Sequence, residues 1–166
     1  MSSEKPLDVL VIAASNGENL KLAQRVQASA RSLGQQSELL DLTTLDLPLF
    51  TPRTQAANGI PTAISTLQGL LTSAPRWVIC APEYNGSSPT CLSNASAWLA
   101  GQGDASRALF TGRPIALATP YGGGGMEEVG AMRLPLTHRG DEQVGRPGEG
   151  KQGTPANAKD RRGATK

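Results

Sequence analysis

Hydrophobic and polar positions follow two different periods along the chain. Residues 7–14 form an almost unbroken run of β-branched and aliphatic side chains, typical of a strand buried on both faces of a parallel sheet. Residues 16–33 change to a helical period with one apolar face. The side chains predicted to point inward are Leu22, Ala23, Val26, Ala30 and Leu33. The chain therefore opens with a strand followed by a helix.

This alternation continues through the first two thirds of the sequence. Further strands are predicted at residues 37–42, 76–82 and 113–119, and a short helix near 127–133. Two amphipathic helices are predicted to begin with a proline at the first helical position (N1), Pro61 in one and Pro89, after Ser88 as N-cap, in the other. Strands separated by helices predict an α/β fold with a doubly wound parallel sheet. Ser15 and Glu18 have capping-box spacing at the first helix, and residues 43–59 form a long connection of the kind that is often functional.

The pattern ends at His138. The remaining residues contain one Val and no Leu, Ile, Met or aromatic side chain, so they cannot bury enough apolar surface to offset the entropy of ordering them. We expect a folded domain over residues 1–138 and a disordered tail over 139–166, rich in glycine and charge. The sheet would then have four clear strands and lack a fifth strand and a last helix. So abrupt a change suggests a truncated or frame-shifted sequence.

Composition narrows the class of protein further. With 166 residues and a net charge of +2, one domain is expected, and the basic excess lies in the tail. No basic cluster is interleaved with aromatic residues, and no apolar run is long enough to cross a bilayer, so neither a nucleic acid nor a membrane is expected as a partner. Two cysteines without zinc-type spacing predict neither a disulfide framework nor a metal site. A cytoplasmic protein is expected.

Three loops follow predicted strands, where open α/β sheets bind their ligands. The first, residues 14–19, consists of small residues leading into a helix, whose free N–H groups favour a phosphate. Ser15 and Asn19 can add side-chain donors. The alternative is that Ser15 only caps the helix. The GxGxxG and GxxxxGK[ST] patterns are absent, which disfavours a dinucleotide-binding Rossmann domain or a nucleotide triphosphatase.

The second loop begins at Pro82 and Glu83. An exposed Tyr84 beside Asn85 and Gly86 offers a flat apolar face and backbone donors, which suit a planar heterocycle. The alternative is a tight turn that needs Asn-Gly for its backbone conformation.

The third loop starts at Thr119 and contains four consecutive glycines, residues 122–125. Such a run is typical of close approach of the backbone to a ligand, although a flexible linker is the alternative.

These strings together resemble the NADPH-dependent FMN reductase family, flavodoxin-like flavoproteins that include quinone, chromate and azo-dye reductases. The string PEYNGSSPTCLSNASAWL, residues 82–99, resembles the family's PEYNgs-P-x-x-L-K-N-A-x-D-W-L signature. NLKLA at 19–23 is similar to its N-x-x-L-A, and DLPLF at 46–50 to its D-L-P-L-F. The resemblance covers residues 7–136 and implies a flavodoxin-like fold.

The resemblance also implies a function. FMN would be bound with its phosphate at Ser15 and Asn19, its ring along residues 82–86, and its other side at Thr119, Gly122 and Gly123. Hydride would pass from NAD(P)H through FMN to a flavin, quinone or similar small-molecule acceptor, and the protein would supply no general acid or nucleophile. The resemblance further implies a homodimer, in which the loop at 43–59 reaches the flavin of the partner.

Departures from the family pattern favour a second interpretation. The first loop has no arginine, and it contains Glu18. In the 82–99 string, Ser93 and Ser96 stand where the family usually has Lys and Asp. The chain also loses its apolar pattern after His138. The alternative is therefore a truncated, non-enzymatic remnant that binds FMN weakly or not at all.

Four other side chains are interpreted as structural. Cys80 and Cys91 are predicted to serve packing; for Cys91 the alternative is a thiol whose pKa is lowered by its place in the first turn of a helix. Trp77 and Trp98 are predicted to anchor the core or a dimer interface.

Overall fold

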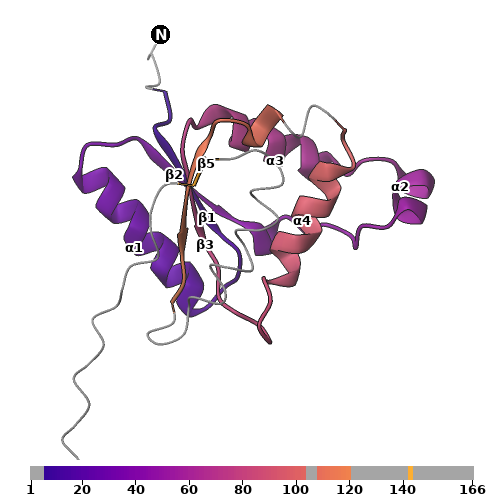
Figure 1. Ribbon diagram of the computed structural model, residues 1–166, viewed down its shortest axis with the longest axis horizontal. Helices are drawn as coiled ribbons and strands as arrows, with labels where there is room; N and C mark the ends of the chain where they lie inside the picture. Colours follow the sequence, from indigo (N-terminus) through magenta and orange to yellow (C-terminus); the bar gives the residue numbers. More distant parts are fainter. Residues whose placement is uncertain (1–5, 104–107, 121–141, 144–166) are drawn as a thin grey trace, which may run out of the picture.

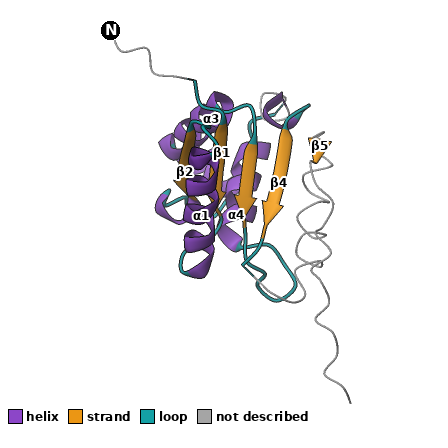
Figure 2. Cartoon of the chain, turned by 90° about the vertical axis from the view of Figure 1, so that its left-hand side faces the viewer, coloured by secondary structure: helices purple, strands orange, loops and turns teal. Residues whose placement is uncertain are grey.

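The computed structural model describes residues 6–103, 108–120 and 142–143, and its centre is a parallel β-sheet. The elements in chain order are β1 (Val9–Ala13), α1 (Glu18–Ser32), β2 (Ser37–Asp41), the 3-10 turn η1 (Leu42–Thr44), α2 (Pro52–Asn58), α3 (Thr62–Ser73), β3 (Trp77–Cys80), α4 (Thr90–Ala100), β4 (Pro114–Ala118) and β5 (Glu142–Gln143). The strand order is β2-β1-β3-β4-β5, with every neighbouring pair parallel. Figure 2 shows the arrows side by side and pointing the same way. The predicted α/β fold with a flavodoxin-like doubly wound sheet is confirmed.

The four predicted strands are all present, and the structure differs from the expectation of no fifth strand by two residues. Glu142 and Gln143 pair with Pro114 and Ile115 at the free edge of β4. Backbone pairing alone makes this strand, which an apolar pattern could not reveal. The predicted helix near 127–133 and the rest of the predicted tail lie outside the described residues, so the 1–138 and 139–166 division stays a prediction.

Helices cover both faces of the sheet (Figure 1). On one face α1 packs over the small side chains Val11, Ala13 and Cys80 through Ala23. On the other, α3 and α4 cover the larger core, in which Leu10, Ile12, Trp77, Ile79 and Ile115 of the strands meet Ile64, Leu67, Ala95, Trp98 and Leu99 of the helices. Alternate strand residues thus serve opposite faces, as a buried parallel sheet requires.

The helix starts differ from prediction in detail. Gly17 precedes α1 without a side-chain cap, so the predicted capping box of Ser15 and Glu18 is wrong. Pro61 and Pro89, predicted at N1, occupy the N-cap positions of α3 and α4. Each helix therefore begins one residue later than predicted, and Pro89 replaces Ser88 as the N-cap of α4. Leu33, predicted to face inward, is 78% exposed because it caps the C-terminus of α1.

The connection 43–59 contains the unpredicted helix α2. Thr51 caps it by accepting the Thr54 N–H at 2.9 Å, and Gly59 ends it with φ of 73°. No residue of α2 is buried. Figure 1 shows α2 projecting from the body beyond α4, so we call residues 43–59 the arm.

Candidate functional site

The strand order reverses between β1 and β3, and the loops that follow these two strands begin side by side. The Ala14 N–H donates to the Cys80 carbonyl at 2.8 Å, and the Ala81 N–H donates to the Ala118 carbonyl at 2.9 Å. These bonds continue the sheet pairing past the strand ends. All three loops predicted to carry function therefore leave the same edge of the sheet, where doubly wound folds bind ligands.

The first loop leads into α1 with its backbone donors available. Gly17 adopts φ of 62°, which favours glycine, and no side chain caps the helix. The N–H groups of the first turn have no acceptor within the helix and lie at the positive end of its dipole. The loop thus presents donors suited to an anion.

Asn19 fixes the shape of this loop. Its side chain is 2% exposed, and its Nδ2 donates to the carbonyls of Ser15 at 3.0 Å and Cys80 at 2.9 Å. The amide donors of Asn19, predicted to serve a phosphate, are thus both engaged by the main chain. Asn19 ties the first loop to the end of β3, and its Oδ1 is buried with no hydrogen-bond partner among the described residues.

The second loop is a two-residue hairpin. Tyr84 and Ser87 exchange both backbone hydrogen bonds, at 3.0 and 3.1 Å, around Asn85 at φ 55° and Gly86 at φ 70°. Two positive φ angles define a type I′ turn, for which Asn-Gly is strongly preferred. Glu83 Oε1 accepts the Gly86 N–H at 3.0 Å and reinforces the turn. Turn geometry therefore accounts for Asn85 and Gly86, whereas Pro82 is buried against the body.

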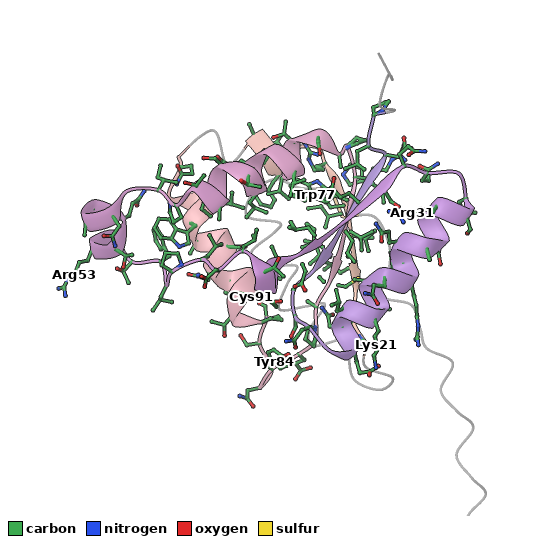
Figure 3. The ribbon with its side chains drawn as sticks, turned by 180° about the vertical axis from the view of Figure 1, so that it is seen from behind. Lys21, Arg31, Arg53, Trp77, Tyr84 and Cys91 are labelled. Atoms are coloured by element: carbon green, nitrogen blue, oxygen red, sulfur yellow. The ribbon has the colours of Figure 1, made fainter. Side chains whose placement is uncertain are left out.

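Tyr84 connects the second loop to the first. Its hydroxyl lies 2.6 Å from Ser15 Oγ, although the residue is 51% exposed, and Ser15 is 7% exposed. Figure 3 shows Tyr84 at the edge of the molecule where Lys21 of α1 also lies. The structure thus brings together the two predicted loops through their side chains.

Cys91 is a further link that the sequence interpretation missed. In the first turn of α4, its Sγ–H donates to the Ala14 carbonyl at 2.6 Å. Burial raises the pKa of the Cys91 thiol, which keeps it protonated and able to donate. The contact joins residues 77 positions apart, so only its place at a helix start could have suggested it.

Thr119 represents the third loop. Its Oγ1 is buried and has no hydrogen-bond partner in the described part of the chain. Gly122 and Gly123 lie outside the described residues. The unpaired Thr119 Oγ1 and Asn19 Oδ1 are anomalous, since buried polar atoms are nearly always paired. A bound molecule with hydroxyl or ring N–H groups fits them.

The charges beside the first loop are small and exposed. Glu18 accepts a hydrogen bond from Lys21 Nζ at 2.6 Å, and this bond, together with the Lys21 charge, lowers the pKa of the Glu18 carboxyl. Glu18 is therefore ionised but paired. The described residues contain no group of three or more His, Cys, Asp or Glu side chains placed to hold a metal ion.

The family model for NADPH-dependent FMN reductases matches residues 7–143, which include all three loops. The chain belongs to this family. It is therefore an oxidoreductase of the FMN-dependent, flavodoxin-like class. No curated protein sequence is significantly similar to it.

Solved structures share the fold at low sequence identity. FerB, a flavoenzyme NAD(P)H:(acceptor) oxidoreductase from Paracoccus denitrificans, is 23% identical with a TM-score of 0.63, over 86% of this chain and 77% of that one. An oxidoreductase from Corynebacterium diphtheriae is 18% identical, with a TM-score of 0.61 over 84% and 79%. An azoreductase from Bacillus anthracis str. Sterne is 19% identical, with a TM-score of 0.55 over 83% and 85%. Among the described residues, no helix has the length and apolar character to span a membrane.

Proposed function

We propose that this FMN reductase family member takes hydride from NAD(P)H through bound FMN to a small-molecule acceptor, a flavin, a quinone or a similar compound. The observation that carries the proposal is the meeting of the first two loops at the switch point, where Ser15 contacts Tyr84 at 2.6 Å beside the unpaired Asn19 Oδ1. The family match supports FMN, and the choice between NADPH and NADH as donor belongs to the proposal.

Each loop has a distinct role in this proposal. The α1 N-terminus and the Ser15 hydroxyl would hold the FMN phosphate, and Asn19 would keep the first loop in shape while its free Oδ1 accepts from a hydroxyl of the cofactor. Pro82, Glu83, Tyr84, Asn85 and Gly86 would line the ring, with Thr119, Gly122 and Gly123 on its other side. The type I′ turn, closed by the two backbone bonds between Tyr84 and Ser87, would hold Tyr84, Asn85 and Gly86 as a preformed wall.

When bound, FMN supplies the redox chemistry, accepting a hydride from the nicotinamide and passing reducing equivalents to the acceptor. The chain's own residues bind and orient. None of them needs to act as a general acid or a nucleophile, and the loops contribute backbone donors, an aromatic face and a hydroxyl.

The visible absorption spectrum tests the proposal. Purified protein titrated with FMN should show a perturbed flavin spectrum, and anaerobic NADPH or NADH should bleach it; readmitted quinone should restore the colour. A protein that leaves the FMN spectrum unchanged even at high flavin concentration would instead be a non-enzymatic remnant of the fold.

We also infer that the protein is a homodimer held by the arm. Leu49 of the arm is 68% exposed, Ile60 directly after it is 50% exposed, and α2 between them buries no residue. Two large apolar side chains on a projecting segment suit an apolar partner surface, and the family resemblance implies a second copy.

Light scattering after gel filtration checks this state. The wild type should have twice the 17.3 kDa mass of one chain, and the Leu49→Asp variant should have the mass of a single chain. Leu33→Asp is the matched control, because Leu33 is 78% exposed at the far end of α1. A monomeric wild type contradicts the inference.

A further inference from the structure

Tyr84 occupies the one side-chain hydroxyl that the proposed function assigns to a phosphate. Its phenolic oxygen is 2.6 Å from Ser15 Oγ, across 69 residues of sequence. Ser15 itself is 7% exposed, so its hydroxyl has little access to solvent. The contact is at the short end of O–H···O distances, and one of the two hydroxyls donates to the other.

A phosphate at Ser15 must come within about 2.7 Å of the same oxygen. A serine hydroxyl has one proton to donate, and a fully ionised phosphate oxygen only accepts. When Ser15 donates to Tyr84, that proton is not available to the anion. When Tyr84 donates to Ser15, its hydroxyl still lies 2.6 Å from Oγ and restricts the approach of the phosphate.

The Tyr84 side chain also spans two regions with different proposed tasks. Its backbone belongs to the hairpin that would line the flavin ring, and its hydroxyl touches the loop that would hold the phosphate. The side chain therefore links the loop proposed for the ring to the loop proposed for the phosphate.

We propose that Tyr84 is a specificity-determining residue that acts through Ser15: its hydroxyl competes with the phosphate of FMN and thereby lowers the preference for FMN over riboflavin. The inference rests on the proposed function. Riboflavin lacks the phosphate and does not need the Ser15 hydroxyl, so its binding leaves the Tyr84–Ser15 bond intact.

The surroundings of Tyr84 allow the contact to open. The residue is 51% exposed, and its hairpin is held by the two backbone bonds to Ser87 and by Glu83. None of these bonds involves the phenol. Rotation of the side chain can release Ser15 without opening the turn.

The test compares FMN and riboflavin binding to Tyr84→Phe, which keeps the ring and removes only the hydroxyl. Flavin fluorescence quenching should show FMN bound about three- to tenfold more tightly than by the wild type, the change expected for one net hydrogen bond. The affinity for riboflavin should stay within about twofold of the wild-type value, a change too small for the gain or loss of a hydrogen bond. Ser87→Ala, an exposed hairpin variant, is the matched control and should leave both affinities unchanged.

Weaker FMN binding by Tyr84→Phe would overturn the proposal, because it would make the hydroxyl a ligand of the phosphate. Equal changes for FMN and riboflavin would overturn it too. Ser15→Ala gives the complementary result: it also opens the contact but removes the phosphate donor, so FMN should lose affinity while riboflavin does not.

A failure of the proposed function is recognised separately. If no variant binds either flavin, hydrogen exchange of the cofactor-free protein decides whether the contact exists in solution. Amides in a peptide covering residues 14–20 should exchange faster in Tyr84→Phe than in the wild type or Ser87→Ala. Equal exchange in all three would show that Tyr84 does not hold Ser15, and the inference falls with it.

Discussion

The side chain of Asn94, in α4, accepts a hydrogen bond from the backbone N–H of Phe50 in the arm. Its Oδ1 accepts the Phe50 N–H at 2.8 Å, and its Nδ2 donates to the carbonyls of Pro48 at 3.0 Å and Leu47 at 3.3 Å. Trp98, one turn later, donates from Nε1 to the Pro48 carbonyl at 2.7 Å and packs edge-on against Phe50. The helix that follows the Tyr84 hairpin is thus hydrogen-bonded to residues 47–50 of the arm.

Removing this side chain should destabilise the fold. Asn94→Ala leaves the Phe50 N–H and the Leu47 carbonyl without their partner, and we expect the free energy of unfolding to fall by about 1–3 kcal/mol. Urea denaturation measures the loss. Ser93→Ala, at the exposed neighbouring position, should change stability by no more than about 0.5 kcal/mol. Equal values for the two variants would contradict a structural role for Asn94.

Arg113 forms a second junction, between the start of β4 and the end of α3. Its guanidinium lies 4.6 Å from the centre of the Trp77 ring and donates to the carbonyls of Leu71, Ala74 and Leu109. Burial lowers the pKa of Arg113, yet arginine stays charged at any pH the fold survives.

Arg113→Met should therefore lower the free energy of unfolding by about 2 kcal/mol, because the methionine fills space but supplies no donor to the carbonyls that end α3. Thermal and urea unfolding check the value. Arg76→Met is the control: Arg76 is exposed and makes one long bond, 3.3 Å, to Gln35. If both methionine variants behave alike, the carbonyls are satisfied by water and the junction has no special value.

The local sequence pattern predicts most of the helices and strands but few of the side-chain hydrogen bonds between them. The runs around Val11, Ile79 and Ile115 predict the strands because burial on both faces leaves a clear apolar signal. The Asn85–Gly86 turn is equally predictable, since few other residue pairs adopt positive φ angles at both positions. The site loops can be located because strand ends in such sheets always share an edge.

Contacts between distant residues account for what the sequence does not predict. The sequence predicts that Ser15 donates a hydrogen bond to a phosphate or caps the helix, but in the structure its hydroxyl contacts Tyr84. Asn19 is predicted as a phosphate ligand, although its donors meet the carbonyls of Ser15 and Cys80. The two residues of β5 form a strand by pairing alone. No one-dimensional pattern records which side chain arrives from a distant part of the chain.

The Tyr84 hairpin gives a prediction with a paired control of opposite sign. Gly86 has φ of 70°, and no atom lies within 4 Å of the position that a Cβ would take, so Gly86→Ala meets conformational strain alone and should cost about 1 kcal/mol. Gly69 lies inside α3 with the same free space and no positive φ, so Gly69→Ala should stabilise the protein by about 0.5–1 kcal/mol. Differential scanning calorimetry should show the midpoint falling for the first and rising for the second. A rise for both would mean that the turn is not type I′ in solution.

Alkaline pH should expose the burial of Cys80. Desolvation in β3 raises the pKa of this thiol from 9.0 to about 12. Between these values the unfolded chain loses the proton while the folded chain keeps it, so the unfolded state binds fewer protons and stability falls as pH rises. Below about pH 8 both states hold the proton, and the thiol contributes no pH dependence.

Melting temperatures of the wild type and Cys80→Ala, measured from about pH 8 to about pH 10.5, isolate this effect because alanine has no proton to lose. The alanine variant should melt lower at about pH 8, since it leaves a small void against Val11 and Ala13, yet its midpoint should decline less steeply toward alkaline pH. Parallel declines would place the alkaline sensitivity elsewhere. Cys91, whose pKa burial also raises, is the next thiol to substitute, and its loss would release the Ala14 carbonyl at the same time.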